Sequence, residues 1–256
     1  MKPAVLFLHG HYLGGWAWEE VARDLAGAGW HVASPTLPGC GRGEESEAAR
    51  VGLQEHAGFA SIALTELAQA APGAPLVVVA HSYSGLILQT LLGHRAVAGR
   101  ITAALFLDAV LCQPGECLLD DLLEMVFPGI AAALASQRVE QPPRGFVRPP
   151  SLDPRSESVS ACRRYAEHCG PAPWGSFTDP LASTAVPITQ AVAAPRAYAR
   201  CEKFPLSETI WQQVRGRPGW REEVWPVGHL PMLSHPERVA DWVHRIVREG
   251  LPGLGE

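Results

Sequence analysis

The sequence predicts an α/β fold in which helices cover both faces of a mostly parallel, doubly wound sheet. Short β-rich runs alternate with longer helical patterns through most of the 256 residues, which is typical of this architecture. The runs LVVVA at 76–80 and AALFL at 103–107 are continuously apolar, as expected of strands that are buried on both sides. With 47% hydrophobic and 18% charged residues, the chain can bury a large core.

The alternation defines the elements in order. We expect strands at 4–9, 31–37, 76–80, 102–108, 196–201 and 222–227. The principal helices are expected at 17–29, 53–70, 85–95 and 235–250. In such a sheet the carboxyl ends of the strands lie at a common edge, where loops bring functional residues together.

The alternation stops between residues 112 and 190. This stretch is rich in Pro, Gly and Ser around two weakly helical pieces, CLLDDLLEMV and VSACRRYAEH. An irregular insertion between two core strands fits this pattern better than an independent domain does. We therefore expect one structural domain with a core formed by 1–111 and 191–256 and a cap or lid formed by 112–190.

Composition excludes several classes of function. The net charge is −5 and no stripe of Lys or Arg is present, which argues against a nucleic-acid partner. No apolar run reaches the roughly 18 residues of a membrane span, and the N-terminus lacks the features of a signal peptide. The six cysteines show no zinc-type spacing, so we expect no metal. We expect a cytoplasmic, soluble protein without a membrane partner.

The stretch VVVAHSYSG contains a candidate nucleophile. A serine in the sharp turn between a buried strand and a helix is held in a strained conformation that exposes its hydroxyl, and its neighbours must be small. Ser82 has the small flanks Ala80 and Ser84, and Gly85 permits close helix packing. Ser84 would have the bulky Leu86 as a flank, which favours Ser82. Taken alone, the motif is equally consistent with a structural turn serine.

Two further segments favour catalysis. HGHYLGGW follows the first strand, and the backbone amide of His11 there, with that of Tyr83 after the serine, is expected to form an oxyanion hole. VGHLPMLSH follows the last strand and offers His229 as the general base. Ser82 and His229 would both lie at strand ends, within reach of each other.

The segments HGHYLGGWAW, VAHSYSGL and GHLPMLSHPERVADW resemble the α/β-hydrolase superfamily. More narrowly, they are similar to the branch of small esterases, plant methylesterases and hydroxynitrile lyases. The resemblance implies an α/β-hydrolase fold with an eight-stranded, mostly parallel sheet, a helical cap and a Ser-His-acid triad. By position it implies Ser82 as nucleophile, His229 as base, and the amides of His11 and Tyr83 as oxyanion donors.

The acid of the triad has two candidates. In the family it usually follows a late strand, but the corresponding stretch here, RAYARCEKFPLSE, has no Asp and offers only Glu202. Asp108, at the end of the strand that follows the serine's helix, is the other candidate. A carboxylate at the end of a buried strand needs a partner, whereas Glu202 beside Lys203 suits a solvated surface. We therefore favour Asp108 and keep Glu202 as the alternative.

These residues predict a carboxylesterase that forms an acyl-enzyme without a cofactor. Few charged residues lie near the motifs, so we expect a small, neutral and fairly apolar ester as substrate. The residues expected to line its pocket are Tyr12, Phe127, Trp174, Phe177 and Leu230.

Two alternatives stay open at this point. A lyase, cyclase or thioesterase-like enzyme would use Ser82 and His229 as a proton relay, although the lysine of the hydroxynitrile lyases is replaced here by Leu230. A ligand-binding receptor on a hydrolase fold is the other alternative, but it would not need both residues. The sequence leaves a homodimer open.

Overall fold

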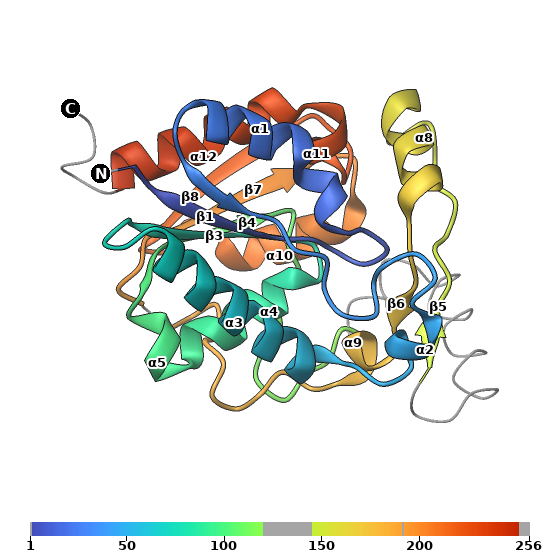
Figure 1. Ribbon diagram of the computed structural model, residues 1–256, viewed down its shortest axis with the longest axis horizontal. Helices are drawn as coiled ribbons and strands as arrows, with labels where there is room; N and C mark the ends of the chain where they lie inside the picture. Colours follow the sequence, from blue (N-terminus) through green and yellow to red (C-terminus); the bar gives the residue numbers. More distant parts are fainter. Residues whose placement is uncertain (1, 120–144, 191, 251–256) are drawn as a thin grey trace.

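The computed structural model describes residues 2–119, 145–190 and 192–250. Its centre is a parallel sheet of six strands in the order β2-β1-β3-β4-β7-β8 (Figure 1). The order reverses direction between β1 and β3, as in other doubly wound sheets. The strands are β1 (Ala4–Leu8), β2 (His31–Ala33), β3 (Leu76–His81), β4 (Ile101–Leu107), β7 (Arg196–Cys201) and β8 (Trp220–Trp225).

Helices cover both faces of this sheet (Figure 1). One face carries α1 (Glu19–Gly27), the short α11 (Pro231–Ser234) and α12 (Pro236–Gly250), with the 3-10 helix η1 (Gly15–Trp18) before α1. The other face carries α3 (Leu53–Ala70), α4 (Ser84–Gly93), α5 (Arg95–Ala98) and α10 (Pro205–Val214), and α2 (Glu45–Ala48) precedes α3.

Two hydrophobic clusters form the core, one on each face. Within β1, Val5 and Phe7 belong to the cluster under α1 and α12, while Leu6 and Leu8 belong to the cluster over α3 and α4. This division follows from the alternation of side chains along a strand. Burial on both faces explains why β1 is apolar throughout and β3 is apolar up to its last residue, His81.

The structure confirms the predicted fold class and corrects some boundaries. The expected strand at 31–37 ends at Ala33, just before Pro35, which has no N–H to donate to a neighbouring strand. The helix expected from residue 17 begins at Glu19, after the 3-10 turn. The eight strands implied by the resemblance are not all found in the central sheet, which has six among the described residues.

Much of the described part of the 112–190 region lies beyond the carboxyl ends of the central strands (Figure 1), whereas its last residues run back along α4. It forms a separate antiparallel pair, β5 (Phe146–Val147) with β6 (Ala172–Pro173), and the helices α8 (Val159–His168) and α9 (Gly175–Thr178). Arg164 of α8 pairs with Glu19 at 2.7 Å and Glu20 at 2.5 Å on α1. These ion pairs hold α8 against α1 of the core.

Among the described residues, no helix combines the length and the apolar character that a membrane span requires.

Candidate active site

The turn between β3 and α4 holds Ser82 in a left-handed conformation, with φ of 53°. The carbonyl of Ser82 accepts hydrogen bonds from the amides of Gly85 (3.0 Å) and Val110 (2.9 Å). A Cβ on Gly85 would lie 2.0 Å from the Val110 carbonyl oxygen, so a side chain there would push α4 away. The glycine thus permits the close helix packing predicted from the sequence.

Backbone strain is concentrated at this edge of the sheet. Among the described non-glycine residues, three have positive φ angles: Tyr12 (65°), Ser82 (53°) and Asp108 (45°). Each follows closely on the end of a parallel strand. Such conformations are costly for L-residues and cluster at functional sites, so their convergence indicates a site that the fold holds in place.

A chain of hydrogen bonds joins Ser82, His229 and Asp108. The distance from Ser82 Oγ to His229 Nε2 is 2.9 Å, and that from His229 Nδ1 to Asp108 Oδ2 is 2.7 Å. With Asp108 Oδ2 as the acceptor of this pair, Nδ1 carries the imidazole proton and Nε2 accepts from the serine hydroxyl. Asp108 Oδ1 accepts from the amide of Cys201 at 2.8 Å. The side chain of Asp108 is completely buried.

Burial determines the charge of the histidine. It lowers the pKa of His229 to about 3, so the imidazole is neutral at pH 7 and able to take a proton. Burial also raises the pKa of Asp108, and hydrogen bonds from Cys201 and Ser207 oppose that rise.

Of the two carboxylates considered from the sequence, Asp108 is the one that contacts His229. Glu202 lies in the turn after β7, where it is exposed and its amide donates to the carbonyl of Trp225 at 2.9 Å. Asp108, which was favoured from the sequence because a carboxylate at a buried strand end needs a partner, is the residue that lies against the imidazole.

Two neighbours of His229 were not anticipated from the sequence. The ring of Phe204 stacks on the imidazole with centroids 3.7 Å apart. His81, directly before Ser82, donates from Nε2 to the carbonyl of His229 at 2.8 Å, and burial lowers its pKa well below the usual value. His81 could have been found from the sequence because it directly precedes Ser82. Phe204 could not, because it lies far from Ser82 and His229 in the sequence and comes close to His229 only in the folded chain.

The loop after β1 borders directly on the serine. A Cβ on Gly10 would lie 2.6 Å from the Cβ of Ser82, so only glycine permits this approach. The backbone that leads into His11 is therefore adjacent to the serine, on the segment where an oxyanion donor was predicted. Tyr83, the source of the second predicted donor, follows Ser82 in the turn and is buried.

The side chains around this loop are firmly held. The His11 ring stacks between Tyr83 (4.3 Å) and Phe177 (3.9 Å). Its Nε2 lies 2.8 Å from Ser176 Oγ, and because that hydroxyl donates to the Pro173 carbonyl, the imidazole is the donor. Helix α9 of the 112–190 region thus contacts the loop that carries His11.

The predicted pocket residues are only partly brought together. Tyr12, Trp174 and Phe177 gather near His11, with ring centroids 6.5 Å apart for Tyr12 and Phe177 and 6.2 Å for Trp174 and Phe177. Leu230, directly before α11, is buried in the hydrophobic cluster under α1 and α12. Phe127 lies outside the described residues.

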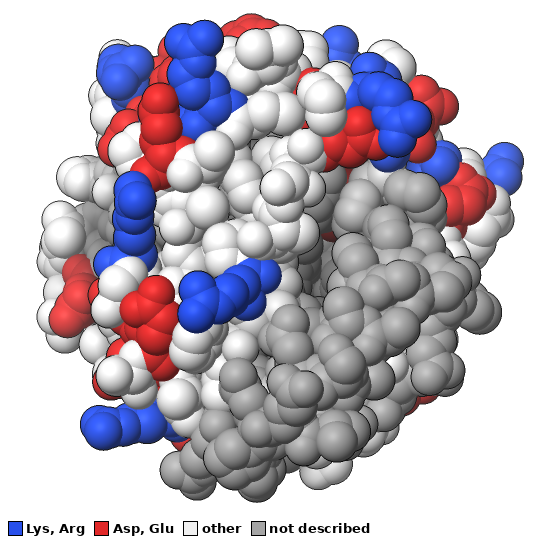
Figure 2. Space-filling model, turned by 90° about the vertical axis from the view of Figure 1, so that its right-hand side faces the viewer, with Lys and Arg blue, Asp and Glu red and all other residues white. Residues whose placement is uncertain are grey.

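Part of the described surface on this side of the molecule is uncharged. Figure 2 faces the side on which the 112–190 region lies, and most of its Lys, Arg, Asp and Glu side chains stand around the periphery. The described surface between them is mostly uncharged, which suits a neutral ligand better than an ionic one.

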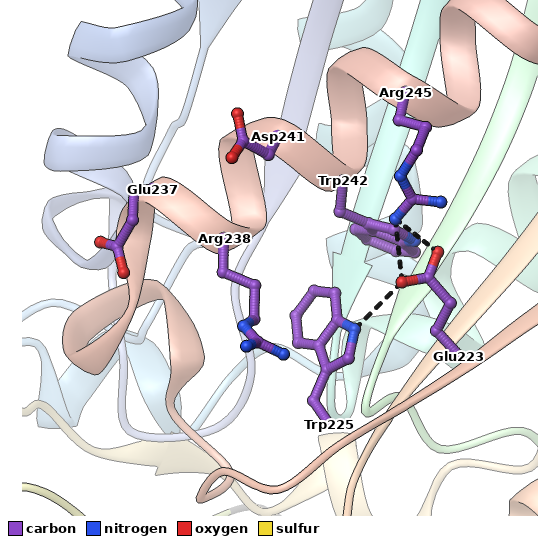
Figure 3. Close-up of a pocket in the computed structure, with 7 residues that line it drawn as sticks. All are labelled: Glu223, Trp225, Glu237, Arg238, Asp241, Trp242 and Arg245. Carbon is purple, nitrogen blue, oxygen red and sulfur yellow. Dashed lines mark hydrogen bonds and ion pairs between the residues drawn. The ribbon is translucent and has the colours of Figure 1, made fainter.

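A hollow of about 420 Å³ lies between β8 and α12 (Figure 3). Two of its charged residues pair with each other, since Arg245 contacts Glu223 at 2.7 Å, and Glu223 also accepts from the indole of Trp225 at 3.1 Å. No member of the Ser82 hydrogen-bond chain lines it. Within the described parts of the chain, no group of three or more His, Cys, Asp or Glu side chains is arranged to hold a metal ion.

Comparison with known proteins places the chain among characterised folds. The family model described as Alpha/beta hydrolase family matches residues 5–242. A carbendazim hydrolyzing esterase from Nocardioides sp. (strain SG-4G) is 24% identical over 247 residues, which cover 92% of this chain and 96% of that protein. The structure of the methylesterase MES16 from Arabidopsis has a TM-score of 0.72 at 21% identity, covering 96% and 98% of the two chains. Methylketone synthase I from tomato, in complex with beta-ketoheptanoate, has a TM-score of 0.71 at 13% identity, covering 98% of each.

Proposed function

The chain belongs to the alpha/beta hydrolase family, and from this premise we propose that it is a serine esterase that cleaves a neutral, fairly apolar carboxylic ester. The observation that carries the proposal is the continuous hydrogen-bond chain from Ser82 through His229 to Asp108. A strained serine, a neutral imidazole and a buried carboxylate in this order are the components of acyl transfer. The esterase name of the Nocardioides relative agrees with it.

In the first half of the reaction, Ser82 attacks the ester carbonyl. His229 Nε2 takes the hydroxyl proton as Oγ bonds to the carbonyl carbon, and Asp108 stabilises the imidazolium through Nδ1. The negative charge that develops on the carbonyl oxygen is met by the amides of His11 and Tyr83. The tetrahedral intermediate then collapses, the alcohol leaves with the proton from His229, and an acyl-enzyme remains.

Water completes the cycle. His229 removes a proton from a water molecule whose oxygen attacks the acyl carbon, and the same two amides stabilise the second oxyanion. Collapse breaks the bond to Ser82 Oγ, which regains its proton from the imidazole, and the carboxylic acid is released. No cofactor takes part in this scheme.

The substrate class follows from what surrounds the serine. Tyr12, Trp174 and Phe177 present aromatic surface near His11, and part of the described surface on that side is uncharged. We propose that they bind the apolar part of the ester and that the 112–190 region acts as the cap over the site.

The test is hydrolysis of p-nitrophenyl esters from acetate to octanoate by wild type, Ser82→Ala and His229→Ala. We expect turnover by wild type and its loss in both variants, with a far-UV spectrum unchanged by either substitution. Wild type without Ser82-dependent release would reject the esterase proposal and favour a proton-relay lyase or cyclase. Turnover that survives in Ser82→Ala would reject the assignment of the nucleophile.

A further inference from the structure

The peptide unit between His229 and Leu230 is hydrogen-bonded on both sides by buried side chains. Its carbonyl accepts from His81 Nε2 at 2.8 Å, and its N–H donates to Glu157 Oε1 at 3.0 Å. His81 belongs to the strand that ends at the serine, whereas Glu157 comes from the 112–190 region just before α8. This peptide unit carries the proposed base, so its position sets where the imidazole lies.

The Glu157 carboxylate is buried beside the loop that carries His229. The residue is 7% exposed, and Oε2 has no hydrogen-bond partner among the described residues. A buried carboxylate is costly unless hydrogen bonds compensate it, and here the compensation comes from the backbone of the loop that carries His229. The free-energy cost of burying the Glu157 carboxylate is thus offset by a hydrogen bond from the loop that carries His229.

The fit between this segment and the loop is close. A Cβ on Gly228 would lie 2.3 Å from the carbonyl oxygen of Ser156 and 2.4 Å from Glu157 Oε1. The loop can therefore meet Glu157 only because residue 228 has no side chain. Arg164 holds the following helix, α8, against α1, so the carboxylate is presented from a segment that is itself fastened to the core.

We propose that Glu157 is a positioning residue that fixes the backbone of His229 for catalysis, an inference that rests on the proposed esterase function. Its hydrogen bond to the Leu230 amide acts with that of His81 to keep Nε2 in reach of Ser82 Oγ and Nδ1 in reach of Asp108. The 112–190 region thereby contributes to the catalytic geometry as well as covering the site. Its effect is on kcat, because Glu157 acts through the backbone of the loop that carries His229.

The test compares Glu157→Gln with Glu157→Met. Glutamine keeps an acceptor for the Leu230 amide, whereas methionine has a similar size and offers none of comparable strength. We expect Glu157→Met to lower kcat for a p-nitrophenyl ester by roughly 10- to 100-fold with KM unchanged, since small displacements of a catalytic group have effects of this order. Glu157→Gln should retain most of the kcat. Glu167→Gln and Glu167→Met, on the exposed side of α8, are the matched controls and should match wild type.

A second readout does not depend on turnover. The low-field proton resonance of His229 Nδ1, assigned by its loss in His229→Ala, reports the hydrogen bond to Asp108 directly. We expect it to persist in Glu157→Gln and to weaken or shift in Glu157→Met.

The two readouts separate the possible failures. The inference is overturned if Glu157→Met keeps both the wild-type kcat and the resonance, or if Gln and Met lower kcat equally. A loss of kcat that the Glu167 variants share would overturn it as well. If wild type has no esterase activity but the resonance responds as expected, the proposed function fails while the positioning role stands.

Discussion

Ser82, His229 and Asp108 come from three distant parts of the chain and meet at the carboxyl edge of the sheet. Ser82 and Asp108 each have a positive φ, so both side chains are aimed by backbone strain that buried neighbouring strands maintain. The motif around Ser82 and the glycines near His11 and His229 could be recognised from the sequence. Glu157 could not, because within DPRSESVS it resembles any acidic residue of a polar loop, and its burial depends on contacts across the fold.

Asp108→Asn is expected to lower kcat by about 10⁴-fold, because the amide no longer stabilises the imidazolium or selects its tautomer. Glu202→Gln, a carboxylate-to-amide change at an exposed position, should leave kcat unchanged. Steady-state kinetics on the two variants, with circular dichroism to verify folding, makes the comparison. A loss that follows Glu202 instead would assign the acid to that residue.

The pH dependence of kcat/KM tests the state of the base. Burial lowers the pKa of His229 below its ordinary value of 6.5, and the neutral form is the one that accepts the serine proton. We therefore expect activity to persist as the pH falls through 6.5 and to decline only at lower pH. If the wild-type kcat/KM instead falls with a midpoint at or above pH 6.5, the pKa of His229 is not lowered by burial.

Among the elements, those with continuous apolar runs or strong helical periodicity were predicted well. The helix at 53–70 and the strand at 196–201 have the expected bounds, whereas β2 is shorter than expected because Pro35 follows it. All six strands of the central sheet were expected from their β-rich runs, whereas the pairing of β5 with β6 could not be foreseen. These short pieces have no periodicity of their own, and they form where the rest of the molecule gives them a partner.

Gly85→Ala tests the packing of α4 on the turn after β4. The added Cβ would lie 2.0 Å from the Val110 carbonyl oxygen, so the helix must shift, at a cost of about 1–3 kcal/mol of unfolding free energy. Gly58→Ala is the matched control: it lies exposed within α3 with open space around it, and should stabilise by about 0.5–1 kcal/mol. Urea unfolding measures both. Equal stability of the two variants would contradict the described contact.

Across the molecule, several histidines lie buried or partly buried around the site. Burial lowers the pKa of five of them, and each is neutral in the folded state at pH 7. The side chain of each of these histidines is hydrogen-bonded to a residue distant in the sequence. The five are His9, His11, His56, His81 and His229. Their hydrogen bonds therefore join the core to the segments that surround the serine.

This arrangement predicts that the protein loses stability as the pH falls below 6.5. The unfolded chain binds protons at its histidines near that pH, whereas the folded chain binds them only at lower pH, for example about 4 for His9 and His56. Each such histidine costs about 1.4 kcal/mol of unfolding free energy per pH unit in that interval. The raised pKa values of Asp108 and Glu157 act in the opposite direction, but they are fewer. Urea unfolding between pH 7.5 and pH 5 measures the slope, and a stability that rises on acidification would contradict it.

The proposed function depends above all on Ser82 as the nucleophile, activated by His229. The most direct measurement is mass spectrometry of the protein after reaction with a serine-directed phosphonate, followed by peptide mapping. We expect one adduct per chain, on the peptide that contains Ser82, and much slower labelling in His229→Ala. An adduct on another residue, or no adduct on folded wild-type protein, would contradict it.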